Sequence, residues 1–85
     1  MRVFENEYGN KFMVKNPLQA SIEYFMAQER TKCKNYVLGE EIKINFFEYQ
    51  KKLTKKVNYT YLVKRIEKTT ISGKKINVID GKQLL

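Results

Sequence analysis

The segment from Lys51 to Lys75 most constrains how this chain can fold, because the excess positive charge of the protein is concentrated around it. Residues 1–50 contain seven Lys or Arg and seven Glu, and residues 51–85 contain ten Lys or Arg with only Glu67 and Asp80 as acids. The net charge of +8 therefore arises entirely after Gln50. A chain of this kind must keep one face of its C-terminal part exposed to water or to a polyanion.

Apolar residues within the basic segment recur at helical spacing. They are Leu62, Val63 and Ile66. On a helix, this spacing would place Thr60, Lys64 and Lys68 together on the opposite face. The pattern predicts a helix over residues 59–68 that packs with one side and presents lysines with the other.

Length and composition predict one globular domain. The chain has 85 residues, of which 42% are hydrophobic, so it can form one modest core but no separate catalytic or effector domain. A globular protein with a net charge of +8 favours nucleic acid as its partner.

Several classes of site are disfavoured by what the sequence lacks. Cys33 is the single cysteine and there is no histidine, so we expect no intramolecular disulfide, no metal site, no cofactor and no enzyme activity. No run of about 18 to 20 apolar residues could span a bilayer, and the N-terminus has no apolar signal region. We therefore expect a cytoplasmic protein with no membrane partner.

Local signals predict the order of the elements in the first half of the chain. Residues 1–15 have the turn signal Tyr8-Gly9-Asn10 between apolar residues and predict an N-terminal hairpin or arm. Asn16 and Pro17 are a favourable N-cap and first helical residue, so a helix is expected from about Pro17 to Lys32, with Cys33 on its buried face. Ile42 and Ile44 alternate with polar residues and predict a short strand.

The second half is predicted to contain two further helices and a hairpin. A capping-box-like pair, Asn45 and Glu48, predicts a helix over about 46–53, and Asn58 is the expected N-cap of the 59–68 helix. Residues 69–79 then predict a hairpin that turns at Gly73-Lys74. The expected fold class is α+β: a winged helix-turn-helix domain over residues 16–85, with three helices and a small antiparallel sheet as the wing.

Particular stretches of the chain support this expectation. NPLQASIEYFMAQER, GEEIKI, VNYTYLVKRI and GKKINVIDGKQLL occur in the order first helix, first strand, recognition helix and wing. From Asn16 to Leu85 the chain resembles the C-terminal DNA-binding domain of the cyclic-AMP receptor and fumarate-nitrate reduction regulator superfamily. The resemblance implies a bacterial or phage transcription regulator that binds double-stranded DNA, with helix 59–68 in the major groove and the 69–79 wing on the backbone. No effector-binding domain precedes residue 16, so no small-molecule effector is implied.

The predicted DNA contacts follow from these positions. The base-contact candidates are Tyr59, Thr60, Lys64 and Lys68. The phosphate-contact candidates are Lys55, Lys56, Asn58, Arg65, Lys74 and Lys75. Where the family has arginine and glutamate, this chain has Tyr59 and Thr60, so the family's operator is not implied.

Two other functions fit the same residues. Tyr59 and Tyr61 interleave with basic residues, as in proteins that bind RNA or single strands by stacking, and in that case NYTYLV would be an exposed strand in a mainly β protein. The domain could instead be a protein-interaction module or a mobile-element-encoded inhibitor of a host protein. The sequence leaves open the operator, activation or repression, and whether a homodimer binds the DNA.

Overall fold

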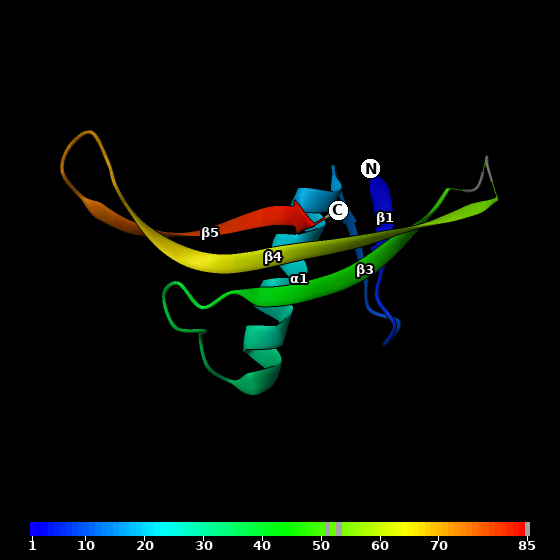
Figure 1. Ribbon diagram of the computed structural model, residues 1–85, viewed down its shortest axis with the longest axis horizontal. Helices are drawn as coiled ribbons and strands as arrows, with labels where there is room; N and C mark the ends of the chain where they lie inside the picture. Colours follow the sequence, from blue (N-terminus) through cyan, green and yellow to red (C-terminus); the bar gives the residue numbers. More distant parts are fainter. Residues whose placement is uncertain (51, 53, 85) are drawn as a thin grey trace.

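The protein is a curled antiparallel sheet of five strands with one helix across one of its faces (Figure 1). The computed structural model describes residues 1–84 except 51 and 53. In chain order the elements are β1 (Arg2–Glu5), β2 (Lys11–Val14), α1 (Pro17–Lys32), β3 (Ile42–Gln50), β4 (Lys55–Thr69) and β5 (Lys75–Leu84). The strand order is β2-β1-β3-β4-β5.

The register of the sheet sorts the side chains into two faces. Ile44 pairs with Tyr61 and Val63 pairs with Gly81, so these residues share the face that α1 covers. We call this the helix face and the other the open face. β4 is the longest strand, and together with β5 it extends well beyond the helix, so the β4–β5 hairpin and the paired ends of β3 and β4 project at opposite ends of a molecule 48 Å long (Figure 1).

Helix α1 begins and ends where its sequence predicts, and the prediction of a helix over 17–32 is confirmed. The side chain of Asn16 accepts a hydrogen bond from the backbone N–H of Gln19 at 2.8 Å, which caps the first turn. The chain leaves the helix at Cys33, whose φ of 56° is left-handed. Cys33 is exposed, so its predicted burial is wrong.

Aromatic residues fill the core between α1 and the sheet. Phe46 stacks on Tyr59 and Tyr61, with ring centroids 5.5 and 5.8 Å apart, and meets Phe4 edge-on at 5.7 Å. The Tyr24 hydroxyl lies 2.6 Å from the carbonyl of Asn10 and 3.1 Å from that of Phe4, which ties α1 to the β1–β2 hairpin. Burial raises the pKa of Tyr24 to about 12, so this hydroxyl stays protonated at neutral pH.

The predicted winged helix-turn-helix is wrong, because the two later helices are strands. Residues 46–50 belong to β3 and residues 59–68 to β4; residues 51 and 53 of the predicted second helix lie outside the described part. The capping-box residue Asn45 instead accepts a cross-strand hydrogen bond from Thr60 at 2.8 Å. Aromatic and β-branched residues, which pack well on a pleated surface, dominate both segments and outweigh the helical spacing.

Both predicted hairpins exist, although the second is longer than expected. β1 and β2 pair around the 6–10 turn, and β1 also pairs with β3, which joins the hairpin to the main sheet. β4 and β5 are joined by a turn in which Gly73 has a φ of 84°. Ile71 lies fully exposed in that turn, and Ile76 pairs with Lys68. Within the described residues, no helix is long and apolar enough to cross a membrane.

Candidate functional site

The open face of the sheet is rich in lysine. The register places on it Lys11, Lys43, Lys56, Lys64, Lys68 and Lys82. Only Glu5 and Asp80 are acidic side chains on the strands of this face. The open face therefore carries six positive and two negative charges, or a net +4, which is half of the net charge of the whole chain.

The helix face, in contrast, pairs both of its arginines and one lysine with carboxylates. Arg2 contacts Glu48 at 2.7 Å, Arg65 contacts Glu29 at 2.7 Å, and Lys75 lies 3.9 Å from Glu67. The arginines donate hydrogen bonds that hold the pKa of Glu48 and of Glu29 below the ordinary carboxyl range, so both acids are ionised at neutral pH. Among the described residues, the lysines of the open face take part in no ion pair. Their charges are thus available to a partner.

An aromatic and basic cluster lies where β3 and β4 approach their connecting turn. The rings of Phe47 and Tyr49 are perpendicular, with centroids 5.2 Å apart, and the amino group of Lys56 lies 4.2 Å from the Phe47 centroid. Tyr49 is 60% exposed. A cavity of about 350 Å³ adjoins Phe47 and Lys56 and is also lined by Asn58, Thr60 and the acidic Glu7. An aromatic ring beside a cation and polar groups can stack a planar ligand and hold its negative charge.

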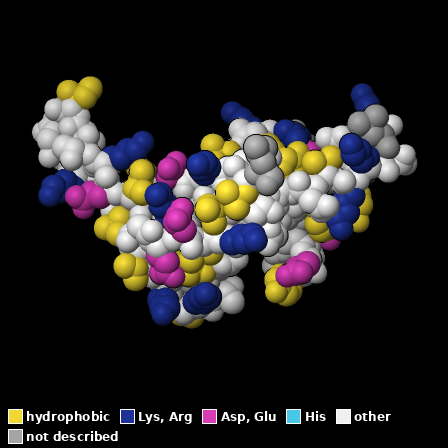
Figure 2. Space-filling model, viewed as in Figure 1, with side chains coloured by type: hydrophobic (Ala, Val, Ile, Leu, Met, Phe, Trp, Pro, Cys, Tyr) yellow, Lys and Arg dark blue, Asp and Glu magenta, His cyan; other side chains and the backbone are white. Residues whose placement is uncertain are grey.

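Hydrophobic side chains continue the open face toward the other end of the molecule. Leu62, Ile66, Val78 and Leu84 are half-buried there, and Ile76 is 38% exposed. In the space-filling view, hydrophobic side chains lie among lysines and arginines and several acidic side chains, and basic side chains lie at both projecting ends (Figure 2). The face can therefore contact both the apolar and the anionic parts of one ligand.

The structure places three of the four predicted base-contact residues on this face. Thr60, Lys64 and Lys68 remain together because a spacing of four returns to the same side of a strand as well as of a helix. Each of the three lies about 13 Å from the next along β4, because a strand rises about 3.3 Å per residue. Tyr59 is on the helix face, half-buried against Phe46. No recognition helix exists at these positions, so the predicted geometry of helix 59–68 in a major groove is wrong.

The predicted phosphate-contact residues divide between the faces. Lys56 and Asn58 lie on the open face. Lys55 begins β4, and Lys74 lies in the β4–β5 turn. Arg65 is in the ion pair with Glu29, and Lys75 lies near Glu67 on the helix face. Whether any of them contacts a nucleic acid stays a prediction.

Sequence reasoning missed the residues that β3 and β5 contribute to the open face. They are Lys43, Phe47, Tyr49 and Lys82. The signal was present in IKINFFEYQ, where isoleucine, isoleucine and phenylalanine alternate with lysine, asparagine and phenylalanine. That alternation has the period of a strand with one buried face.

Comparisons with other proteins do not identify the chain: in searches of protein-family models, curated proteins and solved structures, nothing matches it. In the described part of the chain, no group of three His, Cys, Asp or Glu side chains could hold a metal ion. The candidate site is therefore defined by its lysines and aromatic rings.

Proposed function

We propose that this protein binds single-stranded nucleic acid on the open face of its sheet, without catalysing a reaction. The observation that carries the proposal is the difference between the faces: the helix face neutralises its arginines with carboxylates, and the open face leaves its lysines unpaired beside Phe47 and Tyr49. A sheet that presents aromatic rings among cations is the arrangement with which several RNA- and DNA-binding modules stack bases.

The spacing of the lysines suits an extended strand. Lys64 and Lys68 follow each other along β4, and Lys82 pairs directly across from Leu62 on β5, so cations line the face over much of its length. Each lysine can meet a phosphate, while Phe47 and Tyr49 offer ring surfaces to bases that a single strand leaves exposed. Stacking on such a ring contributes about 1 to 3 kcal/mol per base.

Duplex DNA is the second candidate, and the β4–β5 hairpin favours it. A two-stranded ribbon fits the major groove, which is about 12 Å wide, and this hairpin carries Lys68, Lys74 and Lys75 near its tip. A transcription regulator would use such a ribbon in place of a recognition helix. The single-stranded proposal ranks first because only it uses Phe47 and Tyr49, whose rings cannot reach the stacked bases of a duplex.

Fluorescence anisotropy tests the proposal. A labelled single strand of about 16 nucleotides, the upper end of common site sizes, is titrated with the protein and then competed with unlabelled duplex of the same sequence. We expect the single strand to bind more tightly than the duplex. Equal or tighter duplex binding would favour the second candidate, and no binding of either at low salt would contradict both.

Two variants localise the binding. Phe47→Ala should weaken single-strand binding about 5- to 150-fold if one base stacks on the ring. Lys56→Gln should weaken it as well, and Lys34→Gln removes the same charge from the exposed loop after α1 and serves as the matched control. Equal effects of the two lysine variants would mean that binding follows net charge and not the open face.

A further inference from the structure

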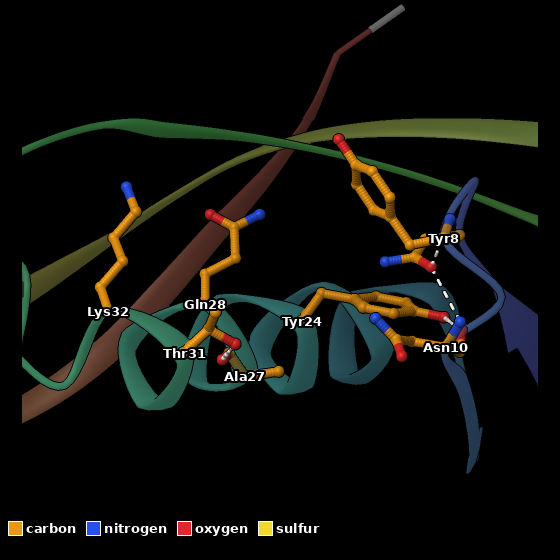
Figure 3. Close-up of a pocket in the computed structure, with 8 residues that line it drawn as sticks. Tyr8, Asn10, Tyr24, Ala27, Gln28, Thr31 and Lys32 are labelled. Atoms are coloured by element: carbon orange, nitrogen blue, oxygen red, sulfur yellow. Dashed lines mark hydrogen bonds between the residues drawn. The ribbon is translucent and has the colours of Figure 1, made fainter.

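A pocket lies between the β1–β2 turn and the exposed side of α1, around the edge of the sheet from the open face. It has a volume of about 290 Å³, close to the lower limit of about 300 Å³ for small-molecule sites. It is lined by Asn6, Tyr8, Asn10, Tyr24, Ala27, Gln28, Thr31 and Lys32. In Figure 3 the ring of Tyr8 stands at one side of the pocket, the side chains of Gln28 and Lys32 stand at the other, and Tyr24 lies between them on α1. The pocket therefore has one aromatic wall and one polar wall.

Three of the polar groups that remain available in this pocket are hydrogen-bond donors. The carbonyl oxygen of Gln28 accepts from the Tyr36 hydroxyl at 2.9 Å, and that of Asn6 accepts from the backbone N–H groups of Tyr8 and Asn10. Among the described residues, neither amide nitrogen has a hydrogen-bond partner. Lys32 adds an ammonium group, which has donors only. These three donors can receive acceptor atoms of a ligand, and the side-chain amide of Asn10, which also lines the pocket, adds one donor and one acceptor.

Tyr8 completes the site with a ring surface. Its side chain is 80% exposed although the turn that carries it is held by the two hydrogen bonds to Asn6. A large aromatic side chain exposed on a rigid turn can cover one side of a planar ligand at low entropic cost. A planar ring with carbonyl acceptors on its edge fits both walls.

A continuous series of hollows joins this pocket to the open face. A second cavity, of about 210 Å³, shares Asn6, Tyr8, Tyr24 and Gln28 with the first and extends past Glu7 to Lys43 and Asn45. Asn45 also lines the cavity that contains Phe47 and Lys56. The path exists because β1 pairs with β3 only at Phe47 and Glu48, so in the described structure residues 42–46 have no strand beside them on that side.

We propose that this pocket receives one nucleobase of a strand that crosses the open face. The inference rests on the proposed function and adds a preference to it. Uracil, thymine, cytosine and guanine carry a carbonyl oxygen on the ring edge, and adenine carries an amine there. Donors from Gln28, Asn6 and Lys32 therefore favour a carbonyl-bearing base over adenine, with Tyr8 stacked on its face.

The experiment compares labelled oligothymidylate and oligoadenylate on the wild-type protein and on three variants. Tyr8→Ala should weaken oligothymidylate binding about 5- to 150-fold. Gln28→Met removes the donor at similar volume and should lower the preference for thymidylate over adenylate about 2- to 12-fold, the effect of one hydrogen bond. Gln19→Met, on the exposed first turn of α1, is the matched control and should keep the preference. Circular dichroism checks that each variant is folded.

A direct measurement on the wild-type protein keeps the inference testable even where a variant unfolds. Thymidine monophosphate should shift the side-chain amide resonances of Asn6 and Gln28 in NMR spectra, whereas inorganic phosphate should not. Tight oligonucleotide binding without these shifts, and with a preference that Gln28→Met does not change, would overturn the pocket and leave the proposed function standing. Failure of both oligonucleotides to bind would overturn the two together.

Discussion

Arg65 on β4 donates two hydrogen bonds to the carboxylate of Glu29 on α1, at 2.8 and 2.7 Å. Glu29 also accepts the backbone N–H of Tyr36 at 2.9 Å, so one buried carboxylate joins the end of α1, the loop that follows it and strand β4. An arginine held in this way is not available to a ligand. The basic segment thus contains one cation whose role is to hold the helix on the sheet.

Breaking this pair should destabilise the protein. Glu29→Gln should lower the free energy of unfolding by about 2 to 4 kcal/mol, because it leaves a largely buried guanidinium without its counter-ion. Urea denaturation of Glu29→Gln, Arg65→Met and the double variant measures the coupling between them. If the pair is structural, the double variant will lose less stability than the sum of the two singles. Full additivity would contradict the coupling.

Stability should also fall in acid. Hydrogen bonds from Arg65 and Arg2 lower the pKa of Glu29 and of Glu48 in the folded state below the unfolded value of about 4.3. The unfolded state then binds protons first, so the stabilisation is complete above about pH 4.3 and is lost as the pH falls through the lower folded values. Urea denaturation over a series of pH values measures this dependence. Glu29→Gln should show a shallower loss in acid, and an unchanged loss would assign the effect to other carboxylates.

The fold was predictable from the sequence where local signals and packing agree. Asn16 and Pro17 fix the start of α1, and the glycine-containing turns at Gly9 and Gly73 mark the two hairpins. These signals are local, since caps and turns depend on a few neighbouring residues. They need no knowledge of what packs against the element.

The error in β4 has a specific physical origin. In a strand covered on one side only, the buried set should alternate with polar residues, but here Tyr61 and Val63 face α1 while Leu62 and Ile66 are half-buried on the open face. Apolar residues on both faces erase the period of two and leave a spacing that also fits a helix. The packing of this segment against α1 and the neighbouring strands favours the strand over the helix. Lys64 and Lys68 still share a face as predicted, because residues four apart lie on the same side of a helix and also on the same side of a strand.

The two faces can be compared directly with the same substitution. Ile44 is 1% exposed in the core and Ile76 is 38% exposed on the open face. Ile44→Ala should cost about 2 to 5 kcal/mol of stability, and Ile76→Ala only about 1 to 2 kcal/mol, because more of the Ile76 side chain stays in contact with water. Thermal or urea denaturation of both variants gives the two values. Equal losses would contradict the assignment of the faces.

A substitution at Gly81 tests how closely β5 approaches α1. A Cβ atom at this position would lie 3.0 Å from Cδ1 of Leu18 and 3.2 Å from Oγ of Ser21. Leu18 is 43% exposed and can turn away, but Ser21 is fully buried and cannot. Gly81→Ala should therefore cost about 1 to 3 kcal/mol, as overpacking does. Adding Ser21→Ala should recover part of the loss in denaturation experiments, and a double variant no more stable than Gly81→Ala would place the strain elsewhere.

Salt dependence tests whether the open face is the surface that meets phosphates. Each phosphate contacted on a single strand contributes about 0.7 to the slope of log affinity against log salt, because a condensed cation is released. Replacing Lys43, Lys64 and Lys82 together by Gln should reduce the slope by about 2 if all three meet phosphates. The control replaces Lys15 and Lys34, which are exposed and lie outside the strands, and it should change the slope little. Affinity for a single strand is measured by anisotropy over a range of salt concentrations. A triple variant with the wild-type slope would show that the strand lies elsewhere, and a control with the larger effect would place it near the ends of α1.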